Sequence, residues 1–159
     1  MIYVLILTPN WHKLYFQDLD FFCSAEFPDP KEDPQLFELV RSLMVHGPCQ
    51  EHMVDGAPCL KNGFCDKGFP KQFQKHSTFE KNFMPRYRRL KKEEGGHTAQ
   101  VYCCRLGREV ELDNRYVVPF NRYLLMKYKV QHIELHICRK LGNCYHEISC
   151  WDVAIFPGN

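Results

Sequence analysis

The stretch DPQLFELVRSLMVHGPC, residues 33–49, combines a helix pattern with the start of a cysteine-rich segment. Asp33 can cap a helix, and Pro34 suits the first helical position. The His-Gly-Pro sequence at residues 46–48 predicts where this helix stops. Between these signals, apolar residues recur at helical spacing and predict one buried face, made of Leu36, Leu39, Val40, Leu43 and Met44.

Strand patterns lie on both sides of this helix. Residues 2–7 are a continuous apolar run of strand length, and residues 130–138 alternate, with Ile133, Leu135 and Ile137 on one face. The pattern fades after Lys140. The sequence therefore predicts an α+β fold with a mainly antiparallel sheet, a few short helices and a His/Cys-rich loop. The other expected elements are strands at 86–92, at 98–112 (folding back at residues 106–107) and at 115–120, and short helices at 70–79 and 121–128.

The length of 159 residues predicts a single domain over residues 1–159. The net charge is only +2, but its distribution is uneven. Residues 18–40 contain seven acids and one lysine, whereas residues 61–92 contain ten basic residues and two acids. A basic middle section suits a polyanionic partner, although two solvated surfaces of opposite sign explain the pattern equally well. The chain has no G-x-x-x-x-G-K-[ST] motif, so no ATP site of that kind is expected.

The cysteine content bears on the compartment. Nine cysteines are an odd number, and residues 1–7 lack the basic leader of an export signal. No apolar run approaches the length of a membrane span. We therefore expect a nuclear or cytoplasmic protein that is not secreted, where clustered cysteines favour a metal over disulfides.

Four potential metal ligands follow the helix: His46, Cys49, Cys59 and Cys65, in the pattern H-x2-C-x9-C-x5-C. Zinc prefers four such donors in a tetrahedron, and a two-residue gap lets the first pair chelate one ion. The alternative is three buried cysteines and a surface histidine. No open position with an adjacent base is evident, so a zinc ion here would be structural. Cys103 and Cys104 are neighbours that face opposite ways on a strand and are expected to be packing residues.

Four longer motifs resemble a known family. They are SAEFPDPKEDPQLFELVRSLMVHGPC (24–49), PCLKNGFCDKGFPKQF (58–73), PRYRR (85–89) and DNRYVVPFNRYLLMKY (113–128). In this order and spacing they resemble the Helitron transposon replicase, in its helicase-like amino-terminal region. The resemblance covers residues 1–138, and residues 139–159 diverge from it.

The resemblance implies part of a rolling-circle initiator of the HUH class. In that family a His-hydrophobic-His strand binds a divalent metal, and a tyrosine pair attacks the DNA phosphodiester. The family's zinc-like ligands match His46, Cys49, Cys59 and Cys65. The two catalytic histidines, however, would fall near Met1 and Tyr3, and the Tyr-x-x-Lys-Tyr segment is missing. The chain is therefore expected to be truncated, with no catalytic residues.

Three further groups invite a catalytic or metal-binding interpretation. Tyr123 and Tyr128 resemble a tyrosine pair, but the family motif makes them core or groove aromatics. His132, Glu134 and His136 would share one strand face, which suits a metal or, more simply, an exposed polar face. Tyr145 has no accompanying base or metal site in the sequence.

The resulting hypothesis is a Helitron-derived fragment that binds single-stranded DNA without cutting it. The alternatives are a rolling-circle nuclease whose missing residues are supplied elsewhere, and a structural remnant without a function. Basic residues would hold phosphates and aromatic residues would stack on bases. The expected DNA contacts are Lys67, Lys71, Phe73, Lys75, Arg86, Tyr87, Arg88, Arg89, Lys91 and Lys92.

Overall fold

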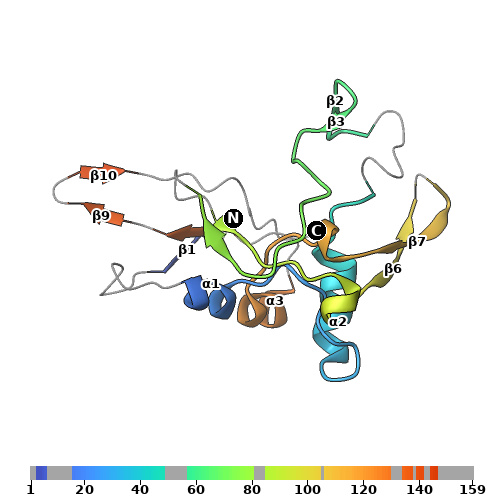
Figure 1. The fold of residues 1–159 in the computed structure, drawn as a ribbon, viewed down its shortest axis with the longest axis horizontal. Coiled ribbons are helices and arrows are strands. Elements are labelled where there is room, and N and C mark those ends of the chain that lie inside the picture. Colours follow the sequence, from blue (N-terminus) through green and yellow to red (C-terminus); the bar gives the residue numbers. More distant parts are fainter. Residues whose placement is uncertain are drawn as a thin grey trace.

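A computed structural model of the chain describes residues 3–6, 16–48, 57–80, 85–104, 106–129, 134–137, 139–141 and 144–146 (Figure 1). Its helices are α1 (Phe16–Phe22), α2 (Pro34–Leu43), α3 (Arg122–Tyr128) and the 3-10 helices η2 (Lys92–Glu94) and η3 (Asn114–Tyr116). Its strands are β1 (Tyr3–Ile6), β2 (Leu60–Lys61), β3 (Phe64–Cys65), β4 (Thr78–Phe79), β5 (Pro85–Arg86), β6 (Ala99–Cys103), β7 (Arg108–Leu112), β8 (Glu134–Ile137), β9 (Arg139–Leu141) and β10 (Cys144–His146).

The helix α2 begins where the sequence predicts. Asp33 is its N-cap, and the Asp33 carboxylate accepts a hydrogen bond from the Leu36 amide at 3.2 Å. Leu36, Val40 and Met44 are buried, whereas Leu39 and Leu43 are half-buried beside the same cluster. The amphipathic pattern therefore identified the packed face of α2 correctly.

The main core lies between α2, α3 and β6. Residues from all three elements share one hydrophobic cluster, completed by residues of the connecting segments: Phe27, Leu36, Val40, Met44, Ala99, Val117, Phe120 and Leu125. The predicted helix at 121–128 is confirmed as α3, with the Asn121 side chain accepting from the Leu124 amide at 2.9 Å. Within the described part of the chain, no helix is long and apolar enough to cross a membrane.

The strands form five two-stranded sheets among the described residues, and four of the five pairings are antiparallel. The predicted hairpin at 98–112 is confirmed as β6–β7, with Gly107 at φ +64° in its turn. The strands predicted at residues 2–7 and 130–138 are present as β1 and β8, which pair in parallel. The α+β class is confirmed, and β9–β10 adds a hairpin that the sequence did not predict.

Two predicted elements are wrong. Residues 70–79 do not form a helix. The amide and the carbonyl of Gln74 both hydrogen-bond to the Arg89 backbone, and the strand β4 follows. Residues 115–120 do not form a strand. The Asp113 carboxylate accepts from the Arg115 amide and caps η3, and only single bridges follow, from Val117 to Val45 and from Phe120 to Ser24. The strand predicted at 86–92 is short, with β5, a bridge at Arg89 and then η2.

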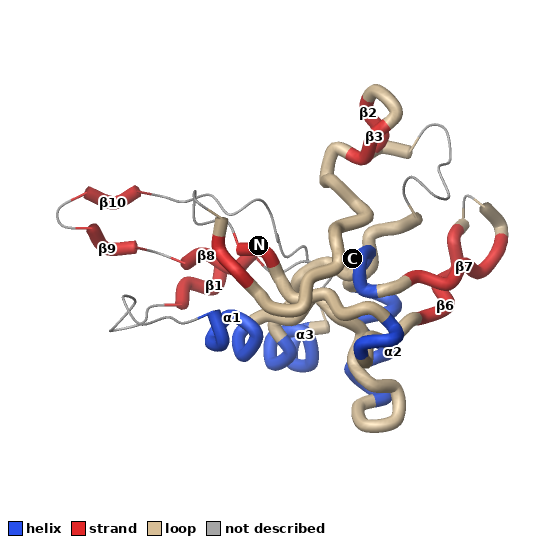
Figure 2. The backbone as a smooth tube through the Cα atoms, viewed as in Figure 1, coloured by secondary structure: helices blue, strands red, loops and turns tan. Residues whose placement is uncertain are grey.

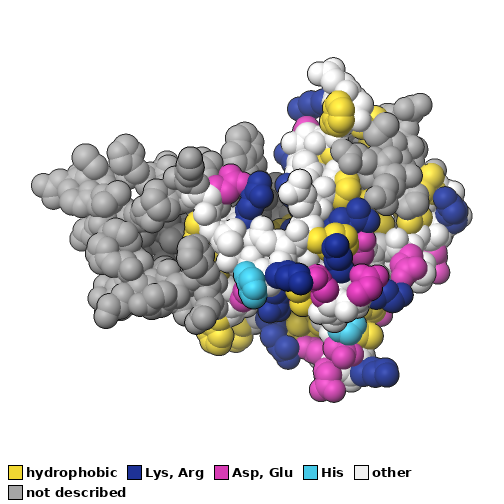
Figure 3. All heavy atoms as spheres, in the orientation of Figure 1, with side chains coloured by type: hydrophobic (Ala, Val, Ile, Leu, Met, Phe, Trp, Pro, Cys, Tyr) yellow, Lys and Arg dark blue, Asp and Glu magenta, His cyan; other side chains and the backbone are white. Residues whose placement is uncertain are grey.

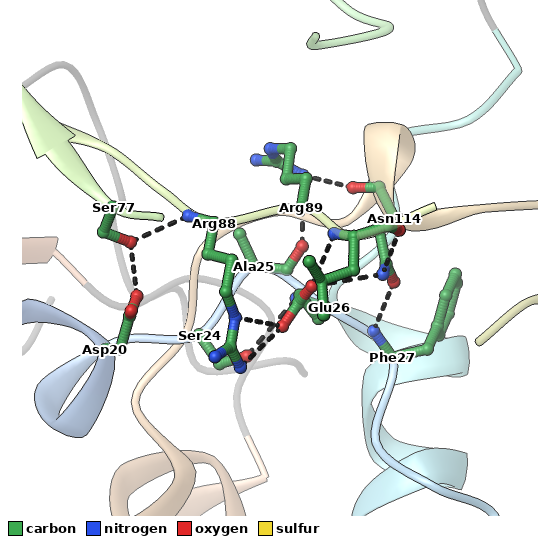
Figure 4. Close-up of polar contacts among 10 residues, drawn as sticks. Asp20, Ser24, Ala25, Glu26, Phe27, Ser77, Arg88, Arg89 and Asn114 are labelled. Atoms are coloured by element: carbon green, nitrogen blue, oxygen red, sulfur yellow. Dashed lines mark hydrogen bonds and ion pairs between the residues drawn. The ribbon is translucent and has the colours of Figure 1, made fainter. Parts of the chain in front are cut away.

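A buried arginine joins three segments of the core. Arg89 is only 4% exposed, and its guanidinium donates to the carbonyl oxygens of Ala25 at 3.2 Å and Asn114 (Figure 4). It also donates to the Val117 carbonyl at 2.7 Å. Desolvation lowers the pKa of Arg89 to about 10, so the group stays charged at neutral pH. The charge is therefore compensated by backbone dipoles.

Asn114 extends this network and is fully buried. Its side chain accepts from the Phe27 amide at 2.8 Å and donates to the Leu90 carbonyl at 3.0 Å. Glu26 accepts from the Leu90 amide and pairs with Arg88 at 2.8 Å (Figure 4). These contacts connect segments far apart in the sequence, so the network specifies how they meet.

Gly96 lies against this network without room for a side chain. An added Cβ would overlap the Leu90 carbonyl oxygen and lie 2.9 Å from the Asn114 side-chain nitrogen. We expect Gly96→Ala to lower the free energy of unfolding by about 2 kcal/mol, because the backbone must shift. Gly47→Ala is the control, since its Cβ would meet nothing within 4 Å. Urea denaturation of both variants checks this, and equal midpoints would contradict it.

Candidate metal centre and basic surface

His46 is held in place by the end of η3 and by the residue that follows it. Its amide donates to the Tyr116 carbonyl at 2.9 Å, directly after the bridge between Val45 and Val117. The imidazole stacks on the Phe69 ring, with the ring centroids 4.4 Å apart and the planes 16° from parallel. The end of α2 and the aromatic ring together therefore fix both the position and the tilt of this side chain.

Cys59 and Cys65 lie at the base of the small hairpin β2–β3, which projects from the core on long loops (Figure 2). Asn62 and Gly63 form its turn with φ values of +53° and +81°. Two positive φ values are typical of the type I′ turn that Asn-Gly favours. The Asp66 amide also donates to the Cys59 carbonyl at 2.7 Å, which closes the hairpin beside the two cysteines.

The three side chains converge. The ligand atoms of His46, Cys59 and Cys65 all lie within 4.8 Å of one another, and Cys65 Sγ is 3.3 Å from His46 Nε2. Donors around a tetrahedral zinc ion are about 3.5–3.8 Å apart. Within the described residues, no disulfide joins Cys59 to Cys65. These three residues, which belong to the predicted set of four ligands, can therefore hold a metal ion together.

The fourth predicted ligand, Cys49, lies outside the described residues. The electrostatics of His46 favour metal binding. Burial lowers the pKa of His46, and the nearby Lys71 ammonium lowers it further. A neutral imidazole offers its nitrogen lone pair to a metal, so His46 suits the role of ligand.

Other predicted groups are placed differently. Cys103 is half-buried and packs against the cluster of Val110, Leu112 and Tyr116, whereas Cys104 is exposed, so the packing role is right only for Cys103. Tyr123 and Tyr128 are not core residues, because they are 64% and 42% exposed on α3. His132 and the side chains of Glu134, His136 and Tyr145 lie outside the described residues.

One of the ten predicted DNA contacts, Arg89, is wrong. Its burial and its bonds to backbone carbonyls prevent it from reaching a phosphate. Four others are paired with acids on the surface, where cationic and acidic side chains are interleaved (Figure 3). These pairs are Lys75–Glu94 at 2.8 Å, Arg88–Glu26 at 2.8 Å, Lys92–Glu111 at 3.7 Å, and Arg86–Glu80.

Three predicted lysines have no acidic partner among the described residues: Lys67, Lys71 and Lys91. Lys71 Nζ donates to the Lys67 carbonyl at 2.7 Å and lies 4.9 Å from the centre of the Phe69 ring. Lys91 Nζ lies 5.9 Å from the centre of the Phe73 ring. Lys71 therefore borders the aromatic ring that supports His46, whereas Lys91 borders Phe73 in the loop that follows.

Phe73 is only half-buried, but cations already contact its ring, since Arg115 lies 5.1 Å from the ring centre in addition to Lys91. Tyr87 is half-buried too. Sequence reasoning missed Phe64, which is 67% exposed on the metal-site hairpin. The Asn-Gly turn signal could have placed it there, because it predicts a hairpin with Phe64 directly after the turn.

Comparison with known proteins gives no identification. No protein-family model matches the chain, and no curated protein matches it either. The resemblance to the Helitron replicase therefore stays a prediction from the motifs.

Proposed function

We propose that the chain is a Helitron-derived replicase fragment, in which a structural zinc ion holds a surface that binds single-stranded DNA. The proposal takes its family from the order of the four sequence motifs. The observation that carries the DNA-binding role is a set of three lysines that form no ion pair with a described acid. Lys67 and Lys71 follow the metal-site hairpin, and Lys91 lies against the Phe73 ring. Phe64 supplies an exposed aromatic ring on the same hairpin.

Zinc is the metal that this donor set suits best. Two thiolates and an imidazole are soft or borderline ligands, and zinc takes them in tetrahedral sites. Cys49 would be the fourth ligand. Bound there, the ion supplies cross-linking rather than catalysis, because it ties the β2–β3 hairpin to the end of α2.

Single-stranded DNA suits the surface for two reasons. Ammonium groups that form no ion pair with an acid can release counterions from phosphates, and an exposed aromatic ring can stack on a base of any identity. Neither the phosphate contacts nor the stacking involves hydrogen bonds to the edges of the bases, so we expect little sequence preference.

The test is binding of labelled oligothymidylate, followed by fluorescence anisotropy at several salt concentrations. We expect the triple variant Lys67→Ala/Lys71→Ala/Lys91→Ala to reduce the slope of log K against log salt by about 2. The matched control is Lys75→Ala/Arg86→Ala/Lys92→Ala, which removes three cations that are paired with acids.

Both triple variants change the net charge by −3, so a difference between them reports local phosphate contacts rather than overall charge. Equal slopes for the two variants, or wild-type binding that is indifferent to salt, would refute the proposed surface. A covalent protein–DNA adduct would instead support the nuclease hypothesis.

A further inference from the structure

The exposed face of α3 combines aromatic rings with cations. Tyr123 and Tyr128 are 64% and 42% exposed, which is unusual for tyrosines on a helix whose other face packs Leu125 into the core. Lys127 Nζ lies 5.3 Å and 5.2 Å from the centres of the two rings, and it donates to the Tyr123 hydroxyl at 3.2 Å. One ammonium group is thus held close to both rings.

This face carries a local excess of positive charge. The sequence has no acidic residue from 114 to 133, whereas Arg122, Lys127 and Lys129 all fall on or directly after α3. Arg122 is paired with Asp33 at 2.8 Å, but Lys127 and Lys129 have no acidic partner in the described part of the chain. Two uncompensated ammonium groups beside two exposed rings are complementary to phosphates and bases.

We propose that α3 forms a second contact surface for single-stranded nucleic acid, in which Tyr123 and Tyr128 stack on bases and Lys127 and Lys129 contact phosphates. The surface is separate in sequence and fold from the β2–β3 hairpin. This inference depends on the proposed function only for its class of ligand, single-stranded nucleic acid. A second contact of this kind would let one strand engage the protein at two places and would raise the overall affinity.

A neighbouring cavity shows why the α3 face is the better site for a polyanion. The cavity has a volume of 360 Å³ and is lined by Arg88 and Arg122. Both arginines are already paired, with Glu26 and Asp33 respectively, so a phosphate there would have to displace a carboxylate. Lys127 and Lys129 form no ion pair with a described acid, so a phosphate at α3 would displace no carboxylate. It would compete instead with the weaker contacts that Lys127 makes to the Tyr123 hydroxyl and to the two tyrosine rings.

The test uses the full chain and a single-stranded oligonucleotide that contains 5-iodo-deoxyuridine. After irradiation, peptide mapping is expected to place covalent adducts on Tyr123 or Tyr128. The double variant Tyr123→Ala/Tyr128→Ala is expected to bind the oligonucleotide at least about tenfold more weakly. Tyr102→Ala is the control, because Tyr102 is 59% exposed but lies on β6. Lys127→Ala and its control Arg108→Ala test the phosphate contact in the same way.

The outcomes separate this inference from the proposed function. Adducts on Phe64 alone would support the hairpin and overturn the α3 proposal. Adducts on α3 alone would support α3 and overturn the hairpin contact, and no adducts would overturn both. If the tyrosine double variant leaves affinity unchanged but abolishes self-association in sedimentation experiments, α3 is an interface between copies of the chain and the proposal is wrong. Thermal unfolding of each variant verifies that it is folded.

Discussion

Replacing Cys59 and Cys65 together with serine is expected to abolish stoichiometric zinc binding and to lower the melting temperature by about 10 °C or more. The hairpin β2–β3 has two paired residues on each strand, and among the described residues its cluster has Cys65 and Phe69 as buried members. So small a core cannot order the segment by burial alone. A bound ion would therefore supply most of the energy that holds the hairpin to His46.

Zinc content by elemental analysis and melting curves with and without a chelator check this prediction. Cys104→Ser is the control, because Cys104 is exposed in the turn that directly follows β6. It is expected to keep the full zinc content and the wild-type melting temperature. If wild-type protein carries no zinc, or if the double variant melts like the control, the metal centre is not what stabilises this region.

Replacing Arg89 with methionine is expected to lower the free energy of unfolding by about 3–5 kcal/mol. The methionine fills much of the space but offers no hydrogen-bond donor. The Ala25, Asn114 and Val117 carbonyl oxygens would then each lose a buried partner. A loss of this size is a large part of the stability of a typical domain.

The matched control is Arg86→Met, which removes an arginine from the same basic stretch. Arg86 is largely exposed and pairs with Glu80, so its loss is expected to change the free energy of unfolding by less than about 1 kcal/mol. Urea denaturation measures the free energy of unfolding of both variants, and equal m values make the two losses comparable. A loss at Arg89 no larger than that at Arg86 would contradict the structural role.

The two predictions are physically linked. Arg89 binds the Val117 carbonyl, Val117 bridges Val45, and the next amide, that of His46, donates to Tyr116. The buried arginine thus helps to hold the segment that positions the metal ligand. We expect Arg89→Met to weaken zinc binding as well, because the segment that positions His46 would be held less firmly.

Local features could be read from the sequence because neighbouring residues determine them. The Asp33 cap, the helical spacing from Leu36 to Met44 and the Asn121 cap each involve atoms within one or two turns. The hairpin at 98–112 likewise follows from a turn and two flanking strands. The predictions at 70–79 and 115–120 were wrong because the backbone of these segments pairs with residues outside them, such as Arg89, Val45 and Ser24.

For the candidate site, the sequence determined which side chains can bind a metal and that a basic stretch follows them. Only the tertiary structure decided that His46 meets Cys59 and Cys65, that Arg89 is buried, and which lysines form ion pairs with acids. The physical reason is distance along the chain. Arg89 and Ala25 are 64 residues apart, and their contact depends on how the whole core closes rather than on any local pattern.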